Sequence, residues 1–232
     1  MYIFNVYAKQ ESGKLKFYNA LPINEKLYLG CSIIGKVKFY YPKNHIFNDS
    51  LATLQSDFYN NFGKDFGIKT DTVSWYFAET NEELQRMKGY DYLYGETTNN
   101  SPSGTSDPLN KRAFGSGLGE FYPHELIHVL INPTYPQSHL WFNEGLCTYY
   151  GMSRGKELDW HLKRFTMYLK ENPTIDLDSM LNYSNMDSFT GFKYVLGGYF
   201  MKKAFEKGGI PLQKKFLVTG KEDWDFYYTI EK

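Results

Sequence analysis

The sequence has no excess of charge of either sign, because 26 acidic residues balance 26 basic ones. It has no basic run either, so nothing in its electrostatics points to a nucleic acid as the partner. Long apolar runs are also missing, since none approaches the length of about 20 residues that crosses a bilayer. We therefore expect neither a nucleic-acid-binding protein nor a membrane span.

Cysteine is scarce as well, with only Cys31 and Cys147 in 232 residues. Two cysteines do not make a disulfide framework, and they leave the redox compartment undecided. Residues 1–10 lack the basic start and the long apolar stretch of an export signal. We expect a soluble chain, extracytoplasmic if a signal has been removed ahead of Met1. The sequence predicts no particular oligomeric state.

Hydrophobic residues make up 42% of the chain and aromatic ones 19%, enough for a sizeable core. Residues 2–41 alternate in strand fashion and predict a small antiparallel β unit. Further on, strand and helix patterns alternate. The predicted fold class is α+β, with a β-rich extension over residues 1–45 and one main domain over residues 46–232.

Further elements follow from apolar spacing and from turn residues. The predicted helices run from the N-cap Asn48 to about residue 62, from the N-cap Asn81 to residue 88, and over residues 140–152, 155–171, 186–207 and 212–218. Residues 72–78 predict a strand.

One segment, residues 95–119, is rich in Gly, Ser, Thr, Asn and Pro. This composition predicts a surface loop. The alternative is that its end, residues 113–119, forms an edge strand or loop beside a cleft, where glycines would let a peptide backbone approach closely.

Residues 122–131 read YPHELIHVLI and contain an HExxH motif formed by His124, Glu125 and His128. A proline in the first turn and the apolar pattern predict a buried helix. Four residues turn a helix by about 400°, so the two imidazoles lie roughly 40° apart and can reach one ion. Glu125 lies too far round to share the ion but can bond to a water on it, as the general base of a zinc hydrolase does. The alternative is two histidines that cap or pack an ordinary core helix.

A zinc ion held by two nitrogens needs a third protein ligand and an open position for water. Glu144 is the main candidate, because it lies on a predicted helix whose other residues are nearly all uncharged. His139 is a rival in the preceding loop. The metzincin pattern is excluded, since it needs Gly and His where Ile131 and Thr134 stand. The remaining histidines have no partner at ligand spacing and are predicted to be structural or solvent-facing; they are His45 and His161.

The pair HELIH and WFNEG resembles the gluzincin metallopeptidases, the peptidase MA-like group, in which HExxH is followed by a helix carrying W-x-x-E-G. The resemblance covers residues 70–220. It implies a thermolysin-like zincin domain in which one Zn²⁺ is held by His124, His128 and Glu144. It also implies that Glu125 is the general base.

Residues 194–209 look like the family's later helix, with an aromatic residue near its start and glycine at its end. The resemblance implies that the Tyr194 hydroxyl faces the metal and donates to the oxyanion. The alternative for Tyr194 is plain packing. The glutamate strand with which the related aminopeptidases hold a free amine has no counterpart in residues 113–119, so we expect an endopeptidase or a peptidase that needs a longer substrate. Glu120 is the one nearby carboxylate that could overturn this expectation.

These observations predict a zinc-dependent metallopeptidase that hydrolyses a peptide or protein substrate. The alternative function is that of an inactive or weakly active metal-binding relative. Such a protein would recognise a peptide or glycan through an aromatic-lined cleft.

Overall fold

The computed structural model describes residues 2–93, 101–175 and 186–218. Its centre is a five-stranded sheet in the order β4-β5-β6-β9-β8. The β4–β5 and β8–β9 pairs are antiparallel, whereas β5–β6 and β6–β9 are parallel. The strands are β4 (Leu29–Ile34), β5 (Val37–Pro42), β6 (Val73–Ala78), β8 (Ser103–Asp107) and β9 (Arg112–Ser116). The mixture of strands and helices agrees with the predicted α+β class.

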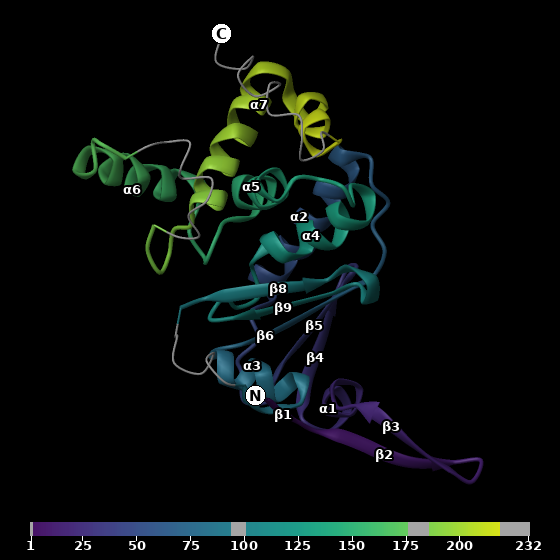
Figure 1. The fold of residues 1–232 in the computed structure, drawn as a ribbon. Helices are drawn as coiled ribbons and strands as arrows, with labels where there is room; N and C mark the ends of the chain where they lie inside the picture. Colours follow the sequence, from purple (N-terminus) through teal and green to yellow (C-terminus); the bar gives the residue numbers. More distant parts are fainter. Residues whose placement is uncertain (1, 94–100, 176–185, 219–232) are drawn as a thin grey trace.

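Helices cover both faces of this sheet (Figure 1). Trp75 and Phe77 of β6 share a core with the helices α2 and α4, whereas Tyr76 shares a second core with α1 and α3. Because β6 is buried on both faces, its sequence reads as a continuous apolar run. The helices are α1 (Leu21–Leu27), α2 (Asp49–Phe66), α3 (Asn81–Lys88), α4 (Pro123–Thr134), α5 (Leu140–Gly151), α6 (Leu158–Glu171) and α7 (Phe192–Val218).

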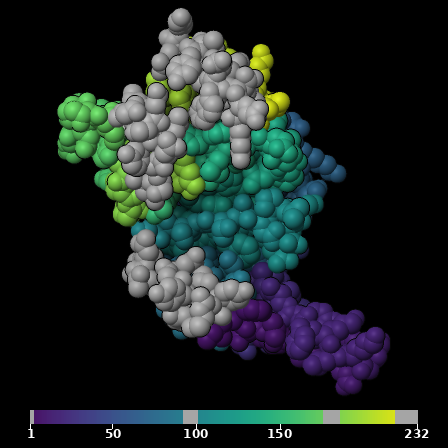
Figure 2. Space-filling view, viewed as in Figure 1, coloured from purple at the N-terminus to yellow at the C-terminus, as the bar shows by residue number. Residues whose placement is uncertain are grey.

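The predicted N-terminal extension over residues 1–45 is too long. Strands β4 and β5 lie within it, yet β5 pairs with β6 in the central sheet. The part that projects is the hairpin of β2 (Val6–Glu11) and β3 (Lys14–Asn19), visible at the purple end of the chain in Figures 1 and 2. Strand β1 (Tyr2–Phe4) pairs with β7 (Tyr90–Leu93), further along the chain.

The prediction of a surface loop over residues 95–119 is wrong for the part that the structure describes, which begins at residue 101. Two strands, β8 and β9, form there around a short 3-10 turn, Pro108–Asn110. Ala113 of β9 is fully buried, and β9 lies between β6 and β8, so it cannot accept another strand. Among the described strands, β8 is the edge strand that lies beside α4. The edge strand predicted at residues 113–119 is therefore found earlier in the chain.

Helix boundaries were predicted with mixed success. The cap at Asn48 is confirmed, since its side chain accepts a hydrogen bond from the Leu51 N–H, but α3 is capped by Thr80 rather than Asn81. The helix predicted from residue 155 begins only at Leu158, because Gly155 adopts φ 72° in a tight turn. The helices predicted at 186–207 and 212–218 are two parts of α7, which begins at Phe192 and is interrupted at Gly209 by non-helical dihedrals.

Among the described residues, no helix has both the length and the apolar character required to cross a membrane.

Candidate metal centre

The HExxH segment lies on α4, which starts with Pro123 at a position where its missing N–H costs no hydrogen bond. His124, Glu125 and His128 are only 3%, 5% and 8% exposed. The helical spacing brings the two imidazoles together as predicted, with their ring centroids 4.9 Å apart. The helix therefore buries an ionisable face beside an otherwise apolar core.

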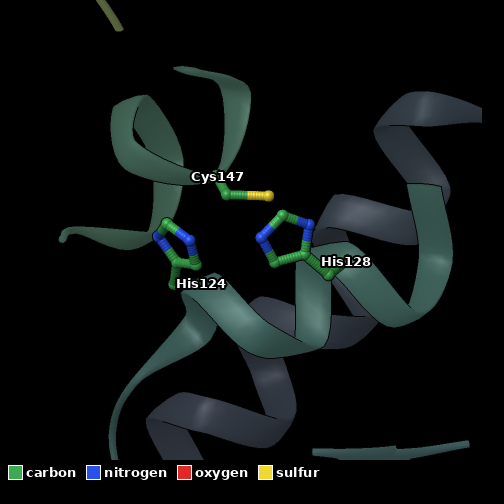
Figure 3. A group of neighbouring side chains, drawn as sticks. All are labelled: His124, His128 and Cys147. Atoms are coloured by element: carbon green, nitrogen blue, oxygen red, sulfur yellow. The ribbon is translucent and has the colours of Figure 1, made fainter. Parts of the chain in front are cut away.

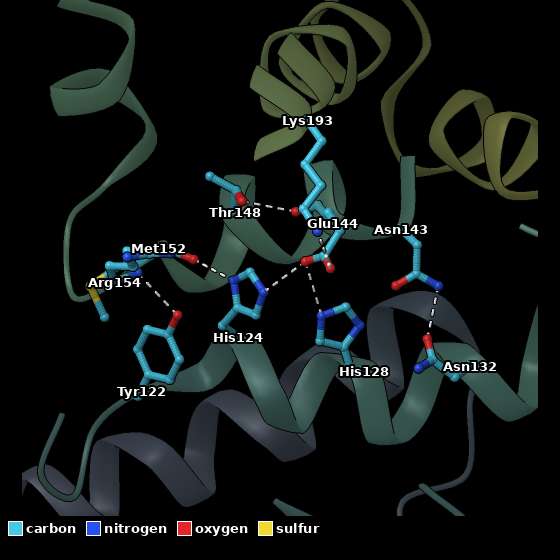
Figure 4. A network of polar contacts seen from close by, with 10 residues as sticks. All are labelled: Tyr122, His124, His128, Asn132, Asn143, Glu144, Thr148, Met152, Arg154 and Lys193. Atoms are coloured by element: carbon cyan, nitrogen blue, oxygen red, sulfur yellow. Dashed lines mark hydrogen bonds and ion pairs between the residues drawn. The ribbon is translucent and has the colours of Figure 1, made fainter. Parts of the chain in front are cut away.

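Glu144 reaches these two imidazoles from the neighbouring helix α5 (Figure 4). Its Oε2 atom lies 3.3 Å from His124 Nε2 and 3.4 Å from His128 Nε2. Two ligands that bind one zinc ion at about 2.0–2.1 Å with tetrahedral angles are separated by roughly 3.3–3.4 Å. Both distances from the Glu144 oxygen are therefore those that one tetrahedral ion requires.

The hydrogen bonds of His124 are compatible with the same fit. Its Nδ1 lies 2.5 Å from the carbonyl oxygen of Met152, which can only accept, so Nδ1 is the donor. Nε2 faces the Glu144 carboxylate, and the space between these two atoms suits either a second proton or a metal cation. A metal-binding histidine commonly donates its other ring N–H to a carbonyl in this way.

The electrostatics of the site also favour a positive charge. Burial works to raise the pKa of Glu144, but its contacts with His124 and His128 outweigh burial and lower that pKa well below the ordinary value. Burial works to lower the pKa of His128, but Cys147, Glu144 and Glu125 outweigh it and raise that pKa well above the ordinary value. A proton or a metal cation is therefore stabilised between these groups.

Cys147 is a second candidate for the third ligand, and the sequence analysis did not consider it as one. Its sulfur and one nitrogen of each imidazole lie within 4.8 Å of one another (Figure 3). The side chain is fully buried and does not line the cleft, and burial raises its pKa to about 11. Glu144 fits a centre that is open to substrate better, because its carboxylate lines the cleft together with His124 and His128.

Glu125 lies beside this centre and against the edge strand β8. An ideal Cβ atom placed on Gly104 would come within 2.4 Å of Glu125 Oε1. A side chain at this point of β8 would require the Glu125 carboxylate to shift from its position. Burial raises the pKa of Glu125 above its ordinary value, and this shift makes the carboxylate a better proton acceptor near neutral pH.

The centre opens into a cleft of about 1030 Å³. One wall is formed by residues 104–106 of β8 and another by residues 135–138, which connect α4 to α5. Tyr194 of α7 lines the same cleft, and its ring centroid lies 6.1 Å from that of His124. Burial, followed by the negative charges of Glu144 and Glu125, raises the pKa of Tyr194, so its hydroxyl stays a proton donor.

The other histidines lie away from the metal centre. His139 caps α5 by accepting a hydrogen bond from the Trp141 N–H, which explains its position without a metal. His161 is fully buried and bonded to Ser153 and Thr190. These contacts agree with a structural role for both histidines.

Glu120 is not in the cleft either. This carboxylate is 3% exposed and accepts hydrogen bonds from His45 and from the backbone N–H of Asn48. Because both hydrogen bonds use the Glu120 carboxylate within the protein, it is not free to bind the terminal amine of a substrate, as an aminopeptidase would require.

Two glycines of α5 allow close contacts with neighbouring helices. Gly145 lets α5 approach α7, since an ideal Cβ on it would lie 2.2 Å from the backbone of Gly197. Gly151 makes the close contact with α4, since its ideal Cβ would lie 2.5 Å from the backbone nitrogen of His124. No local pattern separates these two roles.

Three groups at the site had no signal in the sequence, namely Gly104, Lys193 and the carbonyl of Met152. Each comes from a segment whose position depends on contacts distant in the chain. Lys193 Nζ, for example, lies 3.7 Å from Glu144 Oε1. Comparison with protein-family models and with curated proteins gives no match.

Proposed function

We propose that the protein is a zinc-dependent peptidase with a thermolysin-like catalytic domain. The observation that carries this proposal is the position of Glu144 Oε2, at 3.3 and 3.4 Å from the Nε2 atoms of His124 and His128. These three residues would hold the zinc ion. When bound, zinc supplies a Lewis acid that polarises a carbonyl and lowers the pKa of a coordinated water to about 7.

Two side chains of the cleft then move protons. Glu125 accepts a proton from the attacking water and passes it to the leaving amine. Its raised pKa suits this exchange, because a base whose pKa lies nearer to neutral both accepts and returns the proton readily. Tyr194 donates a hydrogen bond to the oxygen of the attacked carbonyl as negative charge develops on it.

The substrate class follows from the walls of the cleft. Residues 104–106 belong to β8, the edge strand of the described sheet, and an edge strand can pair with an extended peptide. Among the described residues that line the cleft, Glu125 and Glu144 are the only carboxylates. Since neither is free to pair with a terminal ammonium, whose unpaired burial is costly, cleavage inside a peptide is favoured.

The alternative function, binding without catalysis through an aromatic cleft, has less support. Tyr135 and Tyr194 are the only aromatic side chains among the described lining residues apart from the histidines of the site. Other aromatic residues, such as Trp75 and Phe77, are instead fully buried in the core. A site that keeps both a base and a complete ligand set is expected to catalyse.

The test is Glu125→Gln, which keeps the shape of the side chain and removes the proton acceptor. Zinc content should stay near one per chain, while hydrolysis of a quenched-fluorescence peptide library falls by about 10²–10⁴-fold. The exposed Glu171→Gln is the matched control and should change neither quantity. Full activity in Glu125→Gln would refute the assigned base. A wild-type protein that binds zinc and cleaves no peptide would favour the binding function.

A further inference from the structure

The two oxygens of the Glu144 carboxylate have different partners (Figure 4). Oε2 is directed at the two imidazoles, whereas Oε1 lies 3.7 Å from the ammonium of Lys193. The two partners come from separate helices, because the histidines lie on α4 and Lys193 lies on α7. The Glu144 side chain is 14% exposed and that of Lys193 is 31% exposed, so the pair is shielded from much of the solvent.

The position of Lys193 needs an explanation, because it lies in the first turn of α7. The positive end of a helix dipole disfavours a cation there, and α7 has no acidic residue in its first turn. The compensating negative charge comes from Glu144. The same ammonium lies 4.8 Å from the ring centroid of Tyr194, at a distance typical of a cation–π contact.

We propose that Lys193 is a positioning residue of the metal centre and holds Glu144 through Oε1, so that Oε2 alone is offered to the ion. This inference rests on the proposed function of the site. A carboxylate that binds through one oxygen leaves the fourth position free for water, as a catalytic zinc site requires. Lys193 also fixes the Tyr194 ring against the same cleft, which links the ligand to the proton donor.

Zinc affinity tests this role directly, through competition with a chelator of known affinity. Loss of a group that orients a metal ligand typically weakens metal binding by about 10–100-fold, and this loss is expected for Lys193→Gln. Lys193→Arg keeps the charge and should lose less. Lys203→Gln is the matched control, since Lys203 lies on the same helix, is 38% exposed and pairs with Glu206 outside the cleft.

A second measurement reports the coordination itself. With cobalt(II) in place of zinc, a four-coordinate ion absorbs visible light strongly, and binding through both carboxylate oxygens would weaken that absorption. We expect the strong spectrum in the wild type and a weaker one in Lys193→Gln. Equal affinities and spectra in these two proteins, or equal losses in the Gln and Arg variants, would overturn the inference. A wild-type protein that takes up no zinc would instead refute the proposed function itself, and the inference with it.

Discussion

A methyl group added at position 104 should disable the base without disturbing the metal. In the structure, an ideal Cβ on Gly104 lies 2.4 Å from Oε1, 2.7 Å from Cγ and 2.8 Å from Cδ of Glu125. Favourable contacts between heavy atoms lie at about 3.5–4.0 Å. Gly104→Ala therefore requires the Glu125 carboxylate to retreat by about 1 Å.

The expected loss follows from that displacement, since a misplacement of about 1 Å in a catalytic group can cost on the order of 10²-fold in rate. We expect kcat/KM for a quenched-fluorescence peptide to fall by about this factor. Gly104 is not among the glycines with positive φ, so alanine can adopt its backbone conformation. Alanine also reduces the conformational entropy of the unfolded chain, and this gain in stability offsets part of the loss caused by the clash. Zinc content and the urea midpoint should consequently stay close to those of the wild type.

Two controls separate this mechanism from general damage. Gly30→Ala is also a strand glycine, and its Cβ would lie 2.5 Å from the Tyr41 ring, outside the cleft. It should keep full activity. If Gly104 acts through Glu125, then Gly104→Ala should cause no further loss in a Glu125→Gln background. A full hundredfold loss in that background, or normal activity in Gly104→Ala alone, would refute the reasoning.

Three further predictions concern the oxyanion donor, the helix packing and the buried histidine. Tyr194→Phe should lower kcat by about 10²–10³-fold at unchanged zinc content, because it removes one donor to the oxyanion; an unchanged kcat would assign Tyr194 to packing. Gly145→Ala should lower the unfolding free energy measured in urea by about 1–3 kcal/mol, because its Cβ meets the Gly197 backbone and helices α5 and α7 must separate; unchanged stability would contradict this contact. Burial lowers the pKa of His161 below 6.5, so the unfolded chain takes up the proton first and stability should fall as the pH drops below about 6.5. A urea midpoint that shows the same pH dependence in His161→Gln would rule out this contribution.

The face of α4 that carries the two histidines was predictable, because it depends only on the spacing of neighbouring residues in the sequence. The spacing of His124 and His128 fixes their relative direction on any helix, and the apolar residues between them fix which side is buried. The prediction of Glu144 as a ligand required a further step of reasoning, because it depended on the need for a third ligand and on the W-x-x-E-G resemblance. The structure then brings all three side chains together.

The edge strand β8 was not predictable in the same way. Its sequence, SGTSD, has the composition of a loop and becomes a strand only through pairing with β9. Strand formation depends strongly on such pairing, which a single sequence does not reveal. The same limit explains the misplaced boundary at residue 45, since β5 is joined to the central sheet through β6, which lies more than thirty residues further on.

X-ray absorption at the zinc edge tests the central claim most directly, because it reports which atoms bind the ion. If His124, His128 and Glu144 hold the metal, the spectrum should contain only nitrogen and oxygen neighbours at about 2.0–2.2 Å. Cys147→Ser should leave that spectrum unchanged, and Glu144→Ala should greatly reduce the bound zinc. A sulfur neighbour at about 2.3 Å that disappears in Cys147→Ser would contradict the account, because the buried thiol would then be a metal ligand.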